Sequence, residues 1–189
     1  MRSSPIRVLA GALCAAALSG CLGLNDVSRV AEPGYSLNRD RAIVIVGIAA
    51  QGDWRPSNMS VALYEYSLEK QSITGNCWRW NKLEASSDGT RNEVQYFLFD
   101  VAPGYYAGGA SARFAVPISS GNLMFEVPAN RVVYLGDYVY KAADRRLELE
   151  HDLSGAINAI RISYPAIRGE IVTARAHPAP VLQMFACAP

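Results

Sequence analysis

Apolar stretches with the length of β-strands recur along the chain from residue 41 onward, and turn residues separate them. Eight stretches fit this description, namely 41–50, 60–68, 77–83, 92–101, 105–112, 123–127, 131–140 and 147–151. The first is an almost continuous β-branched run, which is typical of a strand buried on both faces. Successive strands begin roughly 10 to 15 residues apart, and this spacing predicts a mainly β protein, an antiparallel β-sandwich, rather than a βαβ fold.

One C-terminal segment has helical spacing instead. Between residues 154 and 176 apolar positions recur at intervals of three and four, and Asp152 or Ser154 can cap the start. Pro165 should split or kink this helix, because proline removes an i→i−4 hydrogen bond. We therefore expect a helical region of two pieces, packed on the sandwich or covering one of its edges.

Two local signals refine the strand prediction. Pro103 and Gly104 occupy the central positions that a type II turn prefers, so strand 105–112 is expected to return antiparallel. Gly136 interrupts the strongest strand and is expected to mark a β-bulge. Such a bulge either aims Asp137 at a ligand or leaves it bonded to a nearby backbone N–H, and we favour the second interpretation.

The first 21 residues carry the features of a secretion signal. Arg2 and Arg7 precede an apolar stretch, 8–18, that is too short to remain as a membrane-spanning helix, which needs about 20 residues. The stretch ends in Leu18-Ser19-Gly20-Cys21, which resembles the lipobox of bacterial lipoprotein precursors. The resemblance implies cleavage before Cys21 and acylation of its thiol, giving two or three acyl chains and stable anchoring. An ordinary signal peptide with an incidental cysteine is the alternative.

This interpretation divides the chain into a lipoprotein signal peptide (1–20), a lipidated N-terminus with a flexible tether (21–38) and a β-sandwich domain (39–189). Leu22 follows the lipidated cysteine where an aspartate would favour retention in the inner membrane of enteric bacteria. We therefore expect a bacterial cell-envelope protein, anchored in the outer membrane on its periplasmic or surface face.

Three further segments occur in a familiar order: 101–106 (VAPGYY), 127–137 (VPANRVVYLGD) and 159–165 (AIRISYP). Together they resemble uncharacterised envelope lipoproteins. The resemblance implies a small β-sandwich of the prealbumin or carboxypeptidase-regulatory kind, within the immunoglobulin-like or prealbumin-like architecture that the strand pattern predicts, and it brings no catalytic residue. A glycine often precedes the core strand in that pattern. Here the residue is Asn130, which tolerates positive φ.

Charge and cysteine content narrow the possible partners. Eighteen Lys and Arg against seventeen Asp and Glu give no net positive charge large enough to attract nucleic acid. The net charge changes from +1 to −1 once residues 1–20 are removed.

The cysteines predict a disulfide. Cys14 leaves with the signal, so Cys77 and Cys187 remain, and we expect them to form a disulfide in the oxidising envelope. Two unpaired buried thiols are the alternative. His151 and His177 show no ligand spacing with either cysteine, so no metal or other cofactor is expected.

Aromatic residues are the best candidates for ligand or partner contact. Trp54 lies in a polar loop, whereas Trp78 and Trp80 are expected on one face of strand 77–83. Exposed tryptophans stack on sugar rings or dock a partner. Strand aromatics more often pack in the core, which is the role expected for Tyr64, Phe97 and Tyr134.

Signals of catalysis are weak. The sequence contains no phosphate-binding loop, zinc-protease motif or EF-hand loop, and Ser111 lacks a nucleophile elbow. His151 is flanked by Glu150 and Asp152, but adjacent residues of a strand point to opposite faces. We expect a non-catalytic binding module for an envelope protein or a glycan. The alternative is a structural or assembly accessory of a larger envelope complex.

Overall fold

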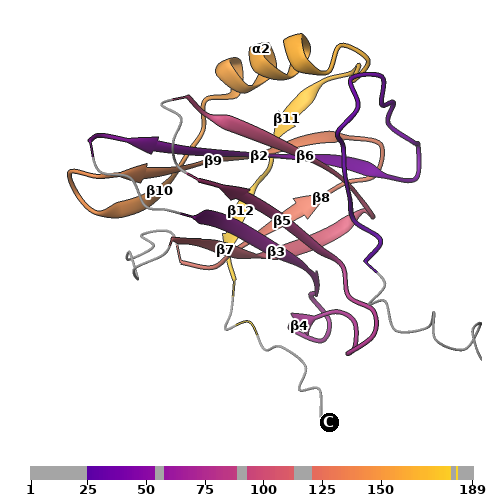
Figure 1. The fold of residues 1–189 in the computed structure, drawn as a ribbon. Coiled ribbons are helices and arrows are strands. Elements are labelled where there is room, and N and C mark those ends of the chain that lie inside the picture. Colours follow the sequence, from indigo (N-terminus) through magenta and orange to yellow (C-terminus); the bar gives the residue numbers. More distant parts are fainter. Residues whose placement is uncertain (1–24, 54–57, 89–92, 113–120, 180–181, 183–189) are drawn as a thin grey trace, which may run out of the picture.

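The computed structural model describes residues 25–53, 58–88, 93–112, 121–179 and 182. Two β-sheets pack face to face, and one helix covers the outer face of the first sheet (Figure 1). The predicted β-sandwich with a helix near the C-terminus is confirmed.

The first sheet has the strand order β1-β6-β2-β9-β10, with β11 paired to β9 beside β10. Its strands are β1 (Ser28–Arg29), β2 (Ala42–Gln51), β6 (Gln95–Val101), β9 (Val132–Lys141), β10 (Arg146–Glu150) and β11 (Ile171–Thr173). The β2–β9 and β11–β9 pairs are parallel and the others antiparallel. The sheet is therefore mixed, where the sequence predicted antiparallel pairing throughout.

The second sheet is antiparallel throughout its described strands. It comprises β12 (Ala176–Pro178), β8 (Leu123–Val127), β7 (Gly104–Ala112), β3 (Met59–Ser67) and β4 (Ser72–Ile73), with β5 (Lys82–Ser87) also paired to β3. Because β7 pairs with β3 and β8, the link at Pro103-Gly104 carries the chain from one sheet to the other. The predicted antiparallel return onto 92–101 is wrong.

Strand β2 is buried on both faces, as its continuous apolar run predicts. Val44 and Val46 face the core between the sheets, while Ile43 and Ile45 face the helix side. Of the aromatics expected in the core, Phe97 and Tyr134 are fully buried. The expectation for Tyr64 is wrong, because its ring is only half-buried and Lys82 Nζ lies 5.7 Å from the ring centroid.

Helix α2 (Leu153–Ser163) begins at the predicted cap, where Asp152 Oδ1 accepts the Gly155 N–H at 2.9 Å. The prediction of helix as far as residue 176 is wrong. Pro165 follows directly after the C-cap Tyr164, and Gly169 has a φ of 100°. The chain then turns, and β11 buries Ile171 beside β9 instead of extending the helix.

The segment 25–38, expected as part of the tether, lies against the sandwich. Ser28 and Arg29 pair with β6, and Val30 donates its N–H to the Leu98 carbonyl at 2.8 Å. Val30 is buried, and Tyr35 packs half-buried on the same cluster. The chain therefore joins the fold upstream of residue 39.

Candidate functional site

Cys77, Trp78 and Trp80 lie in the turn between β4 and β5. The predicted strand 77–83 is wrong over its first part, because β5 begins at Lys82. The Asn76 side chain closes the turn by accepting the Trp78 N–H at 2.9 Å and the Arg79 N–H at 3.0 Å. Such a turn separates side chains that a strand would place on one face.

The two tryptophans accordingly have different surroundings. Trp80 is half-buried and lines a cavity of about 410 Å³. Trp78 does not line this cavity, and 66% of it is exposed. We call this space the Trp80 cavity. Its other lining residues are Asp26, Glu65, Thr74, Gly75, Asn76, Arg79, Asn81 and Ala102.

Asn81 ties three parts of the cavity wall together. Its Oδ1 accepts the backbone N–H of Asp26 at 2.9 Å, and its Nδ2 donates to Glu65 Oε2 at 2.5 Å. The wall therefore combines the N-terminal segment, strand β3 and the turn before β5. The amide oxygen and the amide nitrogen of Asn81 each make one of these hydrogen bonds, and together they hold the three elements in place.

Arg41 holds Asp26, one of the residues that line the cavity. Its Nη1 lies 2.5 Å from Asp26 Oδ2, and its Nε donates to Asp100 Oδ1. Tyr35 donates its hydroxyl to the other oxygen of Asp100. Burial, together with the nearby charge of Asp26, raises the pKa of Asp100. This network positions Asp26 on the cavity wall.

The cavity offers an aromatic ring, two carboxylates, amides and a guanidinium around one space. Its volume lies within the range of roughly 300 to 1,000 Å³ typical of small-ligand sites. Carboxylates and amides hydrogen-bond hydroxyl groups, and a tryptophan ring covers an apolar ring face. A polar ring-shaped ligand such as a sugar matches this combination.

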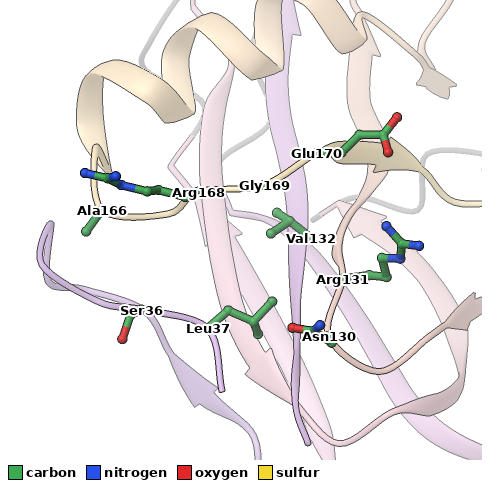
Figure 2. A pocket seen from close by; sticks show the side chains of 9 residues that line it. All are labelled: Ser36, Leu37, Asn130, Arg131, Val132, Ala166, Arg168, Gly169 and Glu170. Atoms are coloured by element: carbon green, nitrogen blue, oxygen red, sulfur yellow. The ribbon is translucent and has the colours of Figure 1, made fainter. Parts of the chain in front are cut away.

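A second cavity, of about 390 Å³, lies between the N-terminal segment, the turn before β9 and the loop before β11. Figure 2 shows that the charged groups of Arg131, Arg168 and Glu170 point in different directions around it. None of the described residues that line it is aromatic. The polar groups do not converge on one position, so this cavity is the weaker candidate.

The bulge predicted at Gly136 is confirmed. Ile45 pairs with Tyr134 and Val46 with Gly136, so Leu135 is the additional residue. Asp137 then lies on the helix side of the sheet, only 2% exposed. Its hydrogen-bond donors are the hydroxyls of Tyr134 and Tyr96, where the sequence favoured a backbone N–H.

The Asp137 carboxyl is incompletely satisfied. Among the described residues its Oδ1 has no hydrogen-bond partner. Burial raises the pKa of Asp137 to about 6, and the nearby charges of Asp152 and Glu150 act in the same direction. His151 is exposed, and its ring meets that of Tyr134 edge-on with 6.2 Å between centroids. The described residues hold no cluster of three or more His, Cys, Asp or Glu suited to a metal ion.

Three of the predicted site residues, Cys21, Trp54 and Cys187, lie outside the described residues. Lipidation and the Cys77–Cys187 disulfide therefore stay predictions, as does any ligand contact of Trp54. Sequence reasoning missed Asp26 and Glu65. Glu65 carried a usable signal, since it is an acid flanked by tyrosines within an apolar strand, whereas Asp26 lies in a segment without periodicity.

No helix within the described ranges has the length and apolar character needed to cross a membrane. Comparisons with protein-family models, with curated proteins and with solved structures found no match.

Proposed function

We propose that this protein is a lipid-anchored, non-catalytic component of the bacterial cell envelope that binds a glycan in the Trp80 cavity. The observation that carries the binding half is the convergence of Trp80, Asp26 and Glu65 on one space of about 410 Å³. The anchoring half is carried by the lipobox-like sequence ending at Cys21.

A glycan fits this site better than an envelope protein does. Protein partners generally need about 800 Å² of surface on each side, whereas a small concave cavity suits a compact ligand. The lining provides oxygen and nitrogen groups for hydroxyls and one ring for stacking. Envelope glycans supply both kinds of chemistry.

Titration of the mature protein with two envelope glycans tests the binding half. The probes are soluble peptidoglycan fragments and the core oligosaccharide of lipopolysaccharide, with binding followed by calorimetry. Trp80→Ala and Glu65→Gln should each weaken binding at least tenfold, because the first removes the ring and the second the carboxylate charge. Glu65→Gln is nearly isosteric, so its folding is expected to match that of the wild type.

Arg168→Ala is the matched control, because Arg168 lines the second cavity and not the Trp80 cavity. It should bind like the wild type. Absence of binding to both glycans, or equal loss in all three variants, would refute the Trp80 cavity as the site.

Labelling of cells with radioactive palmitate tests the anchoring half. The wild-type protein should incorporate label, and Cys21→Ser should not. Cys77→Ser serves as control for a general loss of cysteine and should still be labelled. Continued labelling of Cys21→Ser would contradict the anchor.

A further inference from the structure

On the described part of the surface, large apolar side chains are few and unevenly placed. Among the described residues the exposed ones are Leu68 (47%), Trp78 (66%) and Ile162 (82%). Ile162 is on α2, which covers the first sheet. Leu68 and Trp78 are in turns of the second sheet, at the opposite side of the molecule in Figure 1, where β4 lies.

The turns that carry Leu68 and Trp78 leave the same end of β3. Residues 68–71 connect β3 to β4, and Ser67 of β3 pairs with Ser72 of β4. Residues 75–80 follow, and the chain returns beside β3 where the Glu65 N–H donates to the Asn81 carbonyl at 3.0 Å. We call these two turns the Trp78 end of the domain.

The N-terminal segment enters the fold at this same end. Asn25 Nδ2 donates to the Lys82 carbonyl at 2.8 Å, and the Lys82 N–H donates to Asn25 Oδ1 at 3.1 Å. Lys82 comes two residues after Trp80. Cys21 is only four residues before Asn25, a distance of at most about 14 Å of extended chain. An acyl chain on Cys21 therefore holds the Trp78 end near the lipid.

We propose that the Trp78 end lies on the membrane surface, with Leu68 and Trp78 in the lipid interface. This inference rests on the anchoring half of the proposed function. Tryptophan favours the interfacial region, since its ring is apolar and its indole N–H remains hydrated. Lys70 and Arg79 are exposed cations in these turns and suit anionic headgroups. Glu69 is the neighbouring acid of Lys70, and Asp26 and Glu65 line the Trp80 cavity together with Arg79. Contact by two turns as well as an acyl anchor orients the domain instead of leaving it free to rotate.

Fluorescence quenching by brominated lipid tests this orientation. Mature acylated protein is reconstituted into vesicles of phosphatidylethanolamine and phosphatidylglycerol, with bromine on carbons 6 and 7 of the acyl chains. Wild-type tryptophan emission should fall relative to unbrominated vesicles. In Trp78→Phe this lipid-dependent fall should be at least twofold smaller. Ile162→Ser is the matched control, since it removes an exposed apolar side chain far from the anchor, and it should be quenched like the wild type.

Flotation of the same vesicles separates the two possible failures. Protein that floats and whose quenching is unchanged by Trp78→Phe would overturn the orientation while leaving the anchor intact. Crosslinking of Trp78 to a protein partner without lipid quenching would overturn it in the same way. Wild-type protein that does not float would contradict the proposed lipid anchor and would therefore overturn the proposed orientation as well.

Discussion

Gly47 and Asp137 are register partners in the parallel pair β2–β9, and the carboxylate of Asp137 occupies the space that a side chain at 47 would need. A Cβ atom on Gly47 would lie 2.0 Å from Asp137 Oδ1 and 2.8 Å from Val94 Cγ1. The bulge at Gly136 brings Asp137 to this position. The buried carboxylate of Asp137 therefore requires glycine at position 47.

Gly47→Ala should lower the free energy of unfolding by about 3 kcal/mol, because overpacking a closely packed site forces its neighbours to shift. Denaturant unfolding of the variant against the wild type measures the loss. Gly34→Ala is the control, since no atom of the described part of the chain lies within 4 Å of a Cβ at that position. It should change stability by less than about 0.5 kcal/mol. Equal effects of the two substitutions would contradict the proposed contact.

Stability should depend on pH through Asp137. Burial raises the pKa of Asp137 from 3.8 to about 6, so the folded protein holds this proton more tightly than the unfolded chain does. The stabilising contribution is complete below pH 3.8 and is lost as pH rises through 6. A shift of this size corresponds to about 3 kcal/mol.

Asp137→Asn removes the titration and isolates this effect. The stability of the variant relative to the wild type should increase between pH 4 and pH 7, measured by denaturant unfolding at each pH. Asp144→Asn, in the exposed turn before β10, is the control and should show a flat difference. If the stability difference between Asp137→Asn and the wild type were also independent of pH, the Asp137 carboxyl would not titrate in this range.

Arg41→Ala should destabilise the domain by about 3 kcal/mol. It leaves Asp100, whose side chain is 8% exposed, without its charged partner. It also frees Asp26, so proteolytic cleavage between residues 25 and 40 should become faster. Lys82→Ala removes a more exposed pair, Lys82 Nζ to Glu84 Oε2 at 2.5 Å, and should cost less than about 1 kcal/mol. Similar losses for both would indicate that Arg41 acts as an ordinary surface residue.

Asn130 has a φ of 54°, a conformation that favours glycine and tolerates asparagine. Asn130→Gly should therefore leave the stability unchanged or raise it by up to about 1 kcal/mol, because glycine adopts positive φ without steric strain. Asn130→Val should lower it by about 1 to 2 kcal/mol, since a β-branched residue is strained there. Thermal unfolding of the pair distinguishes the backbone effect, because both variants lose the same amide group. Destabilisation by glycine equal to that by valine would point to the amide instead.

Several elements of the fold could be predicted because their signal is local. The continuous apolar run of β2, the alternation in β10, the bulge at Gly136 and the cap at Asp152 each depend on neighbouring residues alone. The turn at residues 75–80 could not be predicted in this way. Trp78 and Trp80 have the spacing of residues on one face of a strand, but the hydrogen bonds of the Asn76 side chain stabilise a turn there instead.

The candidate site was predictable only in part. Trp80 was identified as a candidate on one face of a predicted strand together with Trp78, but its separation from Trp78 depends on the turn. Asp26 reaches the Trp80 cavity because Arg41 and Asn81 hold the N-terminal segment there. Both contacts join residues far apart in sequence, and no periodicity along the chain encodes them.

The sequence by itself determined that this is a β protein with a capped helix, since burial on a sheet or helix imposes a period on neighbouring residues. Only the tertiary structure decided which sheet each strand joins. It placed β2 and β9 in parallel, sent β7 to the opposite sheet and replaced the second helical piece with β11. Strand pairing depends on contacts between distant segments, and the free energy of burying Ile171 beside β9 outweighs the helical spacing of its own segment.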